Sequence, residues 1–242
     1  VALGVLVKGP VAVLIPLASL LLAVLVERDG ALLLRTLRDG RAWGWLVLIA
    51  APWYAYALWR HGHDFIAGFF LKHNLERFSA PMEGHAGGWL YFMVIAPLLW
   101  MPWSPLLLAL WGHARTLWQD RCLRHALIWA AFVLVFFSLS GTKLPHYGLY
   151  AAPGIVLLIA AAAQRARAWH WAVVALLWLV WQVLMVGGPL ALLQHPQWIE
   201  QADYRALLAQ TSAQMPWTGV LLAWAAVALL GLWAWRRSSP QA

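Results

Sequence analysis

The chain is organised around one stretch, Gly141-Thr142-Lys143-Leu144-Pro145-His146-Tyr147, which separates two apolar runs at residues 126–140 and 148–163. Each run is slightly shorter than the roughly 20 apolar residues that cross a bilayer core, so the stretch is expected at the headgroup layer. Pro145 suits the first turn of a following helix. The free N–H groups of that turn and the charge of Lys143 favour an anion such as a lipid phosphate. The alternative is a lysine that only extends its ammonium to the interface.

Composition excludes a soluble domain. Of the 242 residues, 63% are hydrophobic and 11% are charged, and a soluble domain of this size could not bury so much apolar surface. Apolar runs recur along the chain, and its 19 tryptophans are typical of aromatic belts at membrane interfaces. The sequence therefore predicts an all-α fold, a polytopic transmembrane helical bundle. The net charge of +8 does not indicate nucleic-acid binding, because the basic residues are scattered among the connections.

Seven complete membrane spans are predicted, within a single transmembrane domain of residues 1–242. They cover residues 11–26, 43–59, 89–111, 126–140, 148–163, 169–193 and 217–235. Three prolines, Pro97, Pro102 and Pro105, are expected to bend or break the third span. Between the spans, residues 27–41 predict an amphipathic interfacial turn or helix, residues 61–88 an extracytoplasmic loop, and residues 194–215 a polar loop. Because the chain opens inside an apolar run, we expect it to be the C-terminal part of a longer protein.

The basic residues divide unevenly between the two sides of the predicted bundle. Eleven of the 17 lysines and arginines fall in one set of connections, and all eleven are arginines. The positive-inside rule makes this side cytoplasmic, together with the C-terminus. The three lysines, Lys8, Lys72 and Lys143, then lie outside, which topology alone does not require. This distribution indicates that the outer lysines have a chemical role.

Two of these lysines share a local pattern. Lys8 precedes Gly9 and Pro10, at the predicted start of a helix, as Lys143 precedes Pro145. Two outer helix starts, each with a lysine, are predicted to hold the phosphate or diphosphate of a lipid. The alternative is a coincidence between two interfacial lysines.

The predicted outer loop of residues 61–88 combines charged and aromatic side chains. If the segment is helical, a spacing of four places His73 beside Arg77 and Lys72 beside Glu76. Its phenylalanines would form an apolar face, so we expect a mobile cover over the lipid site; a solvated helix or a rigidly packed loop is the alternative. The motif His61-Gly62-His63-Asp64 is too weak to predict a metal site, and dependence on a divalent metal is left open. No nucleotide-binding loop, Ser–His–Asp order or acidic pair for acid–base chemistry stands out.

Several motifs together resemble a known family. They are Lys8-Gly9-Pro10, Pro52-Trp53-Tyr54, His73-Asn74 with Arg77-Phe78, His85 with Trp89 and Tyr91, and the run from Phe137 to Tyr147 with its Lys143-Leu144-Pro145-His146-Tyr147 core. This set looks like the bacterial branch of the protein O-mannosyltransferase and lipid A aminoarabinose transferase superfamily. The resemblance covers nearly the whole chain up to about residue 163.

The resemblance implies an integral-membrane glycosyltransferase of the GT-C fold in a bacterial inner membrane. Such enzymes transfer a sugar from a polyprenyl-phosphate carrier, here one like undecaprenyl phosphate, to a glycolipid or protein acceptor at the extracytoplasmic face. It implies donor-phosphate binding by Lys8, Lys143, His146 and Tyr147. It also implies a mobile outer loop that carries Lys72, His73, Asn74, Arg77 and His85. The catalytic acidic residue of the family lies in a first outer loop, which this sequence lacks, so no catalytic residue is assigned and the chain alone is expected to be inactive.

A non-catalytic membrane protein is the competing class: a polyprenyl-phosphate-binding transporter or membrane subunit would share the two lysine motifs. A transporter usually carries charged residues at the middle of its spans and interrupted helices in paired halves. The predicted spans are almost free of charge, which favours the enzyme. The sequence identifies neither the sugar nor the acceptor.

Overall fold

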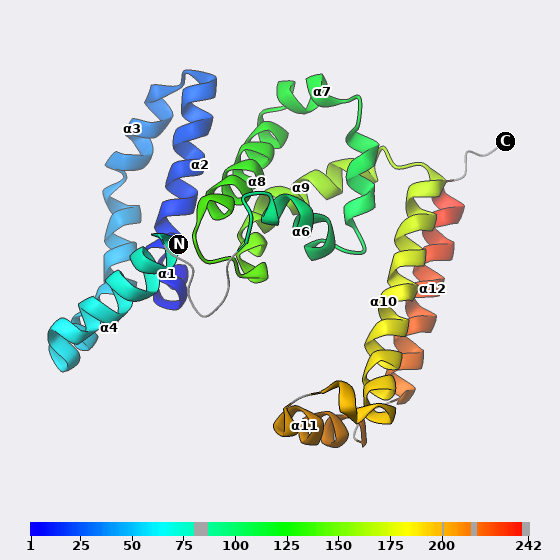
Figure 1. The fold of residues 1–242 in the computed structure, drawn as a ribbon. Coiled ribbons are helices and arrows are strands. Elements are labelled where there is room, and N and C mark those ends of the chain that lie inside the picture. Colours follow the sequence, from blue (N-terminus) through cyan, green and yellow to red (C-terminus); the bar gives the residue numbers. More distant parts are fainter. Residues whose placement is uncertain (80–86, 200, 214–216, 239–242) are drawn as a thin grey trace. The chain divides into compact units, whose positions relative to one another are not determined.

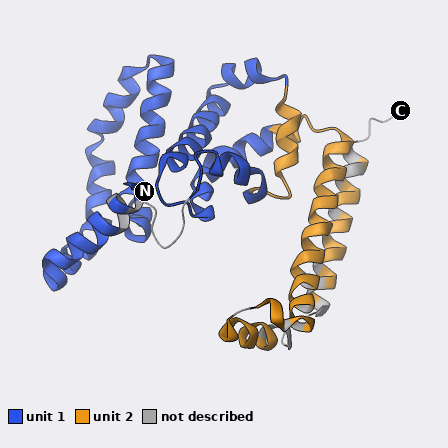
Figure 2. Cartoon of the chain, viewed as in Figure 1, with its two compact units in different colours: residues 1–99, 112–161 blue, residues 100–111, 162–242 orange. Residues whose placement is uncertain are grey.

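The computed structural model of the chain describes residues 1–79, 87–199, 201–213 and 217–238. These residues form helices joined by short connections, and the described part of the chain has no strand, as the all-α prediction requires (Figure 1). The helices divide into two compact units, coloured separately in Figure 2. Unit 1 comprises residues 1–99 and 112–161, and unit 2 comprises residues 100–111 and 162–242.

Unit 1 begins with two helices separated by the predicted break. Helix α1 (Ala2–Lys8) ends at Gly9, and helix α2 (Val11–Glu27) follows directly after Pro10. Gly9 has a φ of 68°, a left-handed conformation that favours glycine. A Cβ at Gly9 would also lie 2.7 Å from the ring of Phe69, so glycine allows this ring to pack against the break.

The segment that follows α2 is helical, in agreement with the amphipathic prediction. Helix α3 (Gly30–Arg38) is capped by Asp29, whose carboxylate accepts a hydrogen bond from the Leu32 N–H at 3.1 Å. Asp39 caps helix α4 (Gly40–Phe65) in the same way. Each aspartate satisfies N–H groups that a helix start leaves without an intrahelical partner.

The predicted outer loop is helical over most of the part that the structure describes, as the spacing of its charged residues allows, and its place outside the membrane stays a prediction. Helix α4 continues to Phe65, with non-helical backbone at Gly62. A wide helical segment, η1 (Ile66–Glu76), and a short turn, α5 (Arg77–Ser79), follow it. The physical reason is the recurrence of phenylalanines: Phe69 and Phe70 pack on Tyr54 of α4, and Phe69 also lies against Gly9. Residues 80–86 of the predicted loop lie outside the described residues.

The rest of unit 1 surrounds helix α8. The elements are α6 (Tyr91–Leu99), α7 (Ala114–Gln119), α8 (Arg121–Leu139), η3 (Pro145–Ala151) and α9 (Ala152–Ala163), of which α9 extends two residues into unit 2. Helices α2 and α8 pack together, and α6 and η3 also pack on α8. The core between them includes Phe92, Val133 and Ala151, none of which is exposed.

Unit 2 contains the long C-terminal helices. Its elements are η2 (Ser104–Leu110), α10 (Ala168–Gln194), η4 (Pro196–Trp198), α11 (Ala202–Ala213) and α12 (Trp217–Ser238). Helices α10 and α12 run side by side (Figure 1). The polar connection predicted at residues 194–215 contains helix α11. This segment is rich in alanine, leucine and glutamine, which are good helix formers despite its polarity.

The number of membrane spans is only partly supported. Within the part of the chain that the structure describes, three helical stretches are long and apolar enough to cross a bilayer: Arg121–Leu139, Pro145–Ala163 and Ala168–Pro189. The predicted third span is interrupted between Leu99 and Ser104, near its prolines, and counts as a fourth only if both pieces form one span. Helix α2 is apolar but shorter, as is the stretch Trp224–Trp233. The count of seven therefore stays a prediction.

Candidate functional site

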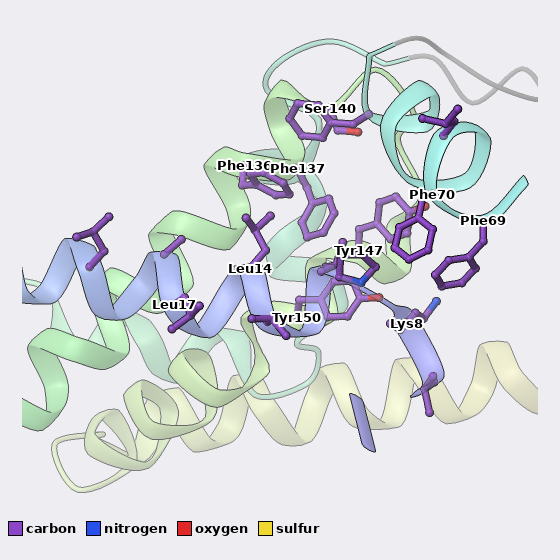
Figure 3. Close-up of a pocket in the computed structure, with 18 residues that line it drawn as sticks. Lys8, Leu14, Leu17, Phe69, Phe70, Phe136, Phe137, Ser140, Tyr147 and Tyr150 are labelled. Carbon is purple, nitrogen blue, oxygen red and sulfur yellow. The ribbon is translucent and has the colours of Figure 1, made fainter. Parts of the chain in front are cut away.

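A large pocket opens in unit 1 between α2, the C-terminal end of α8, η1 and η3 (Figure 3). Its volume is about 1050 Å³. Its lining comprises Val7, Lys8, Pro10, Val11, Val13, Leu14, Leu17, Ala18, Leu21, Phe69, Phe70, Leu71, Phe78, Phe136, Phe137, Ser140, Tyr147 and Tyr150. The predicted outer segment and the Lys143 stretch thus contribute to one cavity with the Lys8 break.

The lining of the pocket is mostly apolar. Apolar side chains, among them the leucines of α2 and the phenylalanines of η1 and α8, make up most of it. Among the described residues, its only polar side chains are Lys8, Ser140, Tyr147 and Tyr150. No Asp or Glu is among the described residues that line it. An apolar cavity with one cation suits a ligand with a long hydrocarbon part and an anionic group.

Lys8 is the cation of the pocket. It lies in the last turn of α1, and its side chain is exposed. Figure 3 shows it at the same end of the cavity as Phe69 and Tyr147, away from Leu17. Within the described ranges, no hydrogen-bond or ion-pair partner engages its ammonium. Lys8 can therefore meet an anion without first breaking another contact.

Lys143 is placed quite differently. It is 5% exposed and does not line the pocket. Its Nζ donates to the carbonyl oxygens of Ser138, at 2.6 Å, and of Ser140. The Phe137 carbonyl oxygen lies 3.5 Å away. Burial lowers the pKa of the Lys143 ammonium from its usual range. The symmetry that the sequence predicts between the two lysines is therefore absent, although a phosphate contact by Lys143 in the loaded protein stays a prediction.

His146 and Tyr147 lie in the first turn of η3. The Tyr147 ring lines the pocket and packs 4.9 Å from the ring of Phe137. His146 is exposed, and its ring lies 4.8 Å from that of Tyr147. The structure thus brings Tyr147 into the site with Lys8, while His146 adjoins Tyr147 without lining the cavity.

The outer segment contributes aromatic side chains to the pocket. Phe69 and Phe70 of η1 line it, and Phe69 packs against Trp53 and Tyr54 of α4. Phe78 packs against Phe136, with ring centroids 4.9 Å apart. These contacts attach the segment to both sides of the cavity.

The charged residues predicted in this segment are less well placed. Lys72 is exposed and does not line the pocket. The backbone of His73, Asn74 and Arg77 is helical, but their side chains lie outside the described residues, and His85 lies outside them altogether. Their roles remain predictions. Across the described residues, no three His, Cys, Asp or Glu side chains gather as they would around a metal ion.

Sequence reasoning missed the helix face that forms one wall of the cavity. Leu14, Leu17, Ala18 and Leu21 of α2 recur at intervals of three and four, the spacing of one helix face. The signal was present, but α2 is apolar on all sides, so the pattern did not single out this face. In the sequence, Tyr54 stands out only as part of the motif Pro52-Trp53-Tyr54. In the structure, its hydroxyl donates to the Val5 carbonyl oxygen at 2.8 Å and holds α1 against α4.

The opposite end of the α2–α8 pair is ionic. Glu27 ends α2, and its carboxylate pairs with Arg124 and, at 2.9 Å, with Arg121 at the start of α8. Arg121 also lies 3.3 Å from Asp29. The hydrogen bond from Arg124, with the nearby charges of His125 and Arg121, holds the pKa of Glu27 below its usual range against the opposing effect of burial. All of these residues lie on the side that the arginine count predicts to be cytoplasmic.

Comparison with known proteins gives consistent relatives. No family model matches the chain. An undecaprenyl phosphate-alpha-4-amino-4-deoxy-L-arabinose arabinosyl transferase from Shewanella sediminis is 31% identical over 147 residues, which are 59% of this chain and 27% of that protein. The protein of the same name from Aeromonas salmonicida is 32% identical over 165 residues, 66% of this chain and 29% of the relative.

The fold has a solved counterpart. The crystal structure of ArnT from Cupriavidus metallidurans bound to undecaprenyl phosphate matches with a TM-score of 0.64 at 23% identity, over 97% of this chain and 42% of that one. The chain thus spans less than a third of the two curated relatives and less than half of the crystallised protein. This partial coverage fits the expectation of a C-terminal portion. The family resemblance inferred from the motifs is confirmed: the chain is similar in sequence to part of the aminoarabinose transferases and shares its fold with part of a solved membrane protein of that kind.

Proposed function

We propose that this chain forms the donor-binding part of a membrane glycosyltransferase. The enzyme would transfer a sugar from a polyprenyl-phosphate carrier to a lipid A-like glycolipid at the extracytoplasmic face of a bacterial inner membrane. The names of the relatives favour undecaprenyl phosphate as the carrier and 4-amino-4-deoxy-L-arabinose as the sugar. Transfer to a protein acceptor stays open as a prediction.

The observation that carries this proposal is the pocket. A cavity of about 1050 Å³ lined by leucine and phenylalanine can receive part of an isoprenoid chain, whose burial is favourable in proportion to its apolar area. Lys8, with Tyr147 beside it, would receive the phosphate at one end. His146 would assist through its contact with Tyr147, and Lys143 belongs to the same predicted donor set.

Catalysis would depend on residues outside the pocket lining. A glycosyl transfer requires a group that accepts the proton of the acceptor, and the described lining contains no carboxylate to act as general base. We therefore expect the 242 residues alone to bind the carrier without transferring sugar. Expression of the chain alone and of the full-length protein, each assayed for transfer from a polyprenyl-phosphate sugar, checks this expectation.

Filling the pocket tests the donor site. In the full-length protein, Leu17→Trp should fill part of the cavity and weaken binding of undecaprenyl phosphate about tenfold, or about 1.4 kcal/mol. Leu25→Trp is the matched control, because Leu25 lies on the same helix, is 64% exposed and does not line the pocket. Equal affinities in both variants and the parent would contradict the proposed site.

The competing transporter or membrane subunit predicts binding without chemistry. Purified full-length protein in vesicles would then bind the carrier and leave its sugar in place under every acceptor condition. Sugar transfer to lipid A that requires the intact pocket would exclude that class.

The outer segment of residues 61–88 is proposed as a cover that closes on the donor. Its support is the placement of Phe69, Phe70 and Phe78 on the pocket, next to a stretch that contains Lys72 and Arg77. Closure would exclude water and limit hydrolysis of the donor. Hydrogen exchange with and without undecaprenyl phosphate measures the effect: slower exchange in residues 65–85 on adding lipid is expected, and unchanged exchange would indicate a rigid segment.

A further inference from the structure

We propose that Lys143 is a positioning residue of the donor pocket, which acts by holding the carbonyl end of α8 in place rather than by contacting the lipid phosphate. This inference rests on the proposed function and revises the role given to one of its residues.

The contacts of the ammonium are those of a helix cap. The last carbonyl groups of a helix have no intrahelical partner, and a cation is favourable there because of the helix dipole. Helix α8 ends at Leu139. The Lys143 Nζ donates to the carbonyl oxygens of Ser138 and Ser140 and lies 3.5 Å from that of Phe137. An ammonium has three N–H donors, so these three oxygens account for its hydrogen-bonding capacity.

The Lys143 side chain is buried as well as hydrogen-bonded. Lys143 is 5% exposed. A Cβ added at Gly87 would lie 2.9 Å from Lys143 Cγ, so the main chain at Gly87 packs directly on the lysine stem. To reach a phosphate, the ammonium would give up its hydrogen bonds to the carbonyl oxygens of Ser138 and Ser140, while the Phe137 oxygen would keep the Ser140 N–H at 3.2 Å. Buried polar groups that lose a hydrogen-bond partner are costly.

The turn that Lys143 closes connects two walls of the pocket. Phe137 and Ser140 contribute to the lining before the turn, and Tyr147 and Tyr150 contribute after it. Within the turn, the Ser140 hydroxyl donates to the Thr142 carbonyl oxygen at 3.2 Å. The path of the chain from α8 into η3 therefore depends on internal hydrogen bonds that include those of Lys143.

The same turn also anchors the outer segment. The Gly141 N–H donates to the Phe78 carbonyl oxygen at 2.6 Å, and the Phe78 ring packs on Phe136. Displacement of the turn would therefore move a wall of the pocket and the attachment of the segment proposed as its cover. A residue that contacts no ligand can control binding in this way.

Two lipids separate a positioning role from a direct one. Binding of undecaprenyl phosphate and of uncharged undecaprenol is measured with the full-length protein and its Lys143→Met and Lys8→Met variants. Lys143→Met should weaken both lipids by the same factor, about tenfold. Lys8→Met should weaken only the phosphorylated lipid. Selective loss of the phosphorylated lipid in Lys143→Met would overturn the proposal, because it would show a phosphate ligand.

A second readout needs no lipid. Without ligand, hydrogen exchange at residues 137–147 should be faster in Lys143→Met than in the parent or in Lys8→Met, because the carbonyl end of α8 is no longer held. Unchanged exchange would also overturn the proposal. If the parent binds neither lipid, the proposed donor site fails, while this measurement still decides whether Lys143 holds the turn.

A variant at Gly87 covers the case in which Lys143→Met does not fold. Gly87→Ala keeps the ammonium but presses a methyl group on the lysine stem. It should weaken both lipids equally and accelerate exchange in the turn. Gly88→Ala is the matched control, because no atom lies within 4 Å of a Cβ added there. Identical lipid affinities and exchange rates in the two alanine variants would contradict the packing of Gly87 on the Lys143 side chain.

Discussion

The two ends of the α2–α8 pair stabilise charged side chains in different ways. At one end, Glu27 of α2 meets the side chains of Arg121 and Arg124. At the other, Lys143 meets no carboxylate in the described structure and is held by the main-chain carbonyls of Ser138 and Ser140. An ion pair between side chains can be lost while the backbone keeps its conformation. A cation bound to main-chain carbonyls, in contrast, holds the backbone conformation itself. The pocket lies at the second end, where the position of the chain matters most.

The ionic network is also more exposed to solvent than the Lys143 side chain. The side chain of Arg121 is 58% exposed, against 17% for Arg124 and 8% for Glu27. Exposed ion pairs contribute little to stability because water screens them. We therefore expect the arginine end to determine orientation in the membrane and the lysine end to shape the site.

The largest expected effect concerns the side of the membrane that each end of the α2–α8 pair faces. Native Cys122 is exposed at the ionic end, and the arginine count predicts that this end is cytoplasmic. In intact cells, an impermeant thiol reagent should modify a cysteine introduced by Ser79→Cys and leave Cys122 unmodified. Inverted membrane vesicles should give the opposite result. Labelling of Cys122 from outside would show that the predicted topology is reversed and that the pocket faces the cytoplasm.

The next effect concerns the packing of α9 on α8. A Cβ at Gly154 of α9 would meet the main-chain carbonyl oxygen of Ala126 and lie 3.0 Å from the Ala130 nitrogen, and main-chain atoms cannot move aside cheaply. Gly154→Ala should therefore lower the free energy of unfolding by about 3 kcal/mol in detergent micelles.

Gly44→Ala in α4 is the control for that substitution. No atom lies within 4 Å of a Cβ added there, so the variant should stabilise by about 0.5–1 kcal/mol through its better helix propensity. Effects of the same sign in both variants would mean that α9 does not pack closely on α8.

A smaller effect is expected for Glu27→Gln. It removes the charge that pairs with Arg124 and should lower the free energy of unfolding by about 2 kcal/mol at neutral pH. Since the pKa of Glu27 is lowered from its usual value of 4.5, its stabilisation is complete above that pH and is lost as pH falls through the folded-state pKa. Unfolding measured from pH 7 to pH 3 should show the two proteins converging in acid. A constant difference over that range would mean that the pair does not stabilise the fold.

The smallest effect is expected for Arg121→Met. With a side chain 58% exposed, Arg121 should contribute less than about 1 kcal/mol, and Arg124→Met should cost more because that guanidinium is largely buried. Added salt should reduce the effect at Arg121 more than that at Arg124. Denaturant titrations at low and high salt check the order; equal costs would show that burial does not separate the two arginines.

The sequence by itself determined the class of the protein. A 63% hydrophobic chain with recurring apolar runs requires helices whose backbone groups are satisfied internally, and a helical membrane protein follows. Gly9 and Pro10 placed the break before α2, the prolines at positions 97 and 102 indicated the interruption after α6, and the Lys143 stretch carried the family resemblance. These features are local, so neighbouring residues suffice to predict them.

Only the tertiary structure decided what each residue contacts. Lys8 and Lys143 look equivalent in sequence, because each precedes a proline at a helix start. In the fold, Lys8 lies open to a pocket formed by segments up to about 140 residues apart, and Lys143 turns back on the helix that precedes it. The physical reason is that a local pattern specifies a helix start but not its surroundings. Whether an ammonium meets a carbonyl oxygen, a carboxylate or open space depends on which distant segment packs beside it.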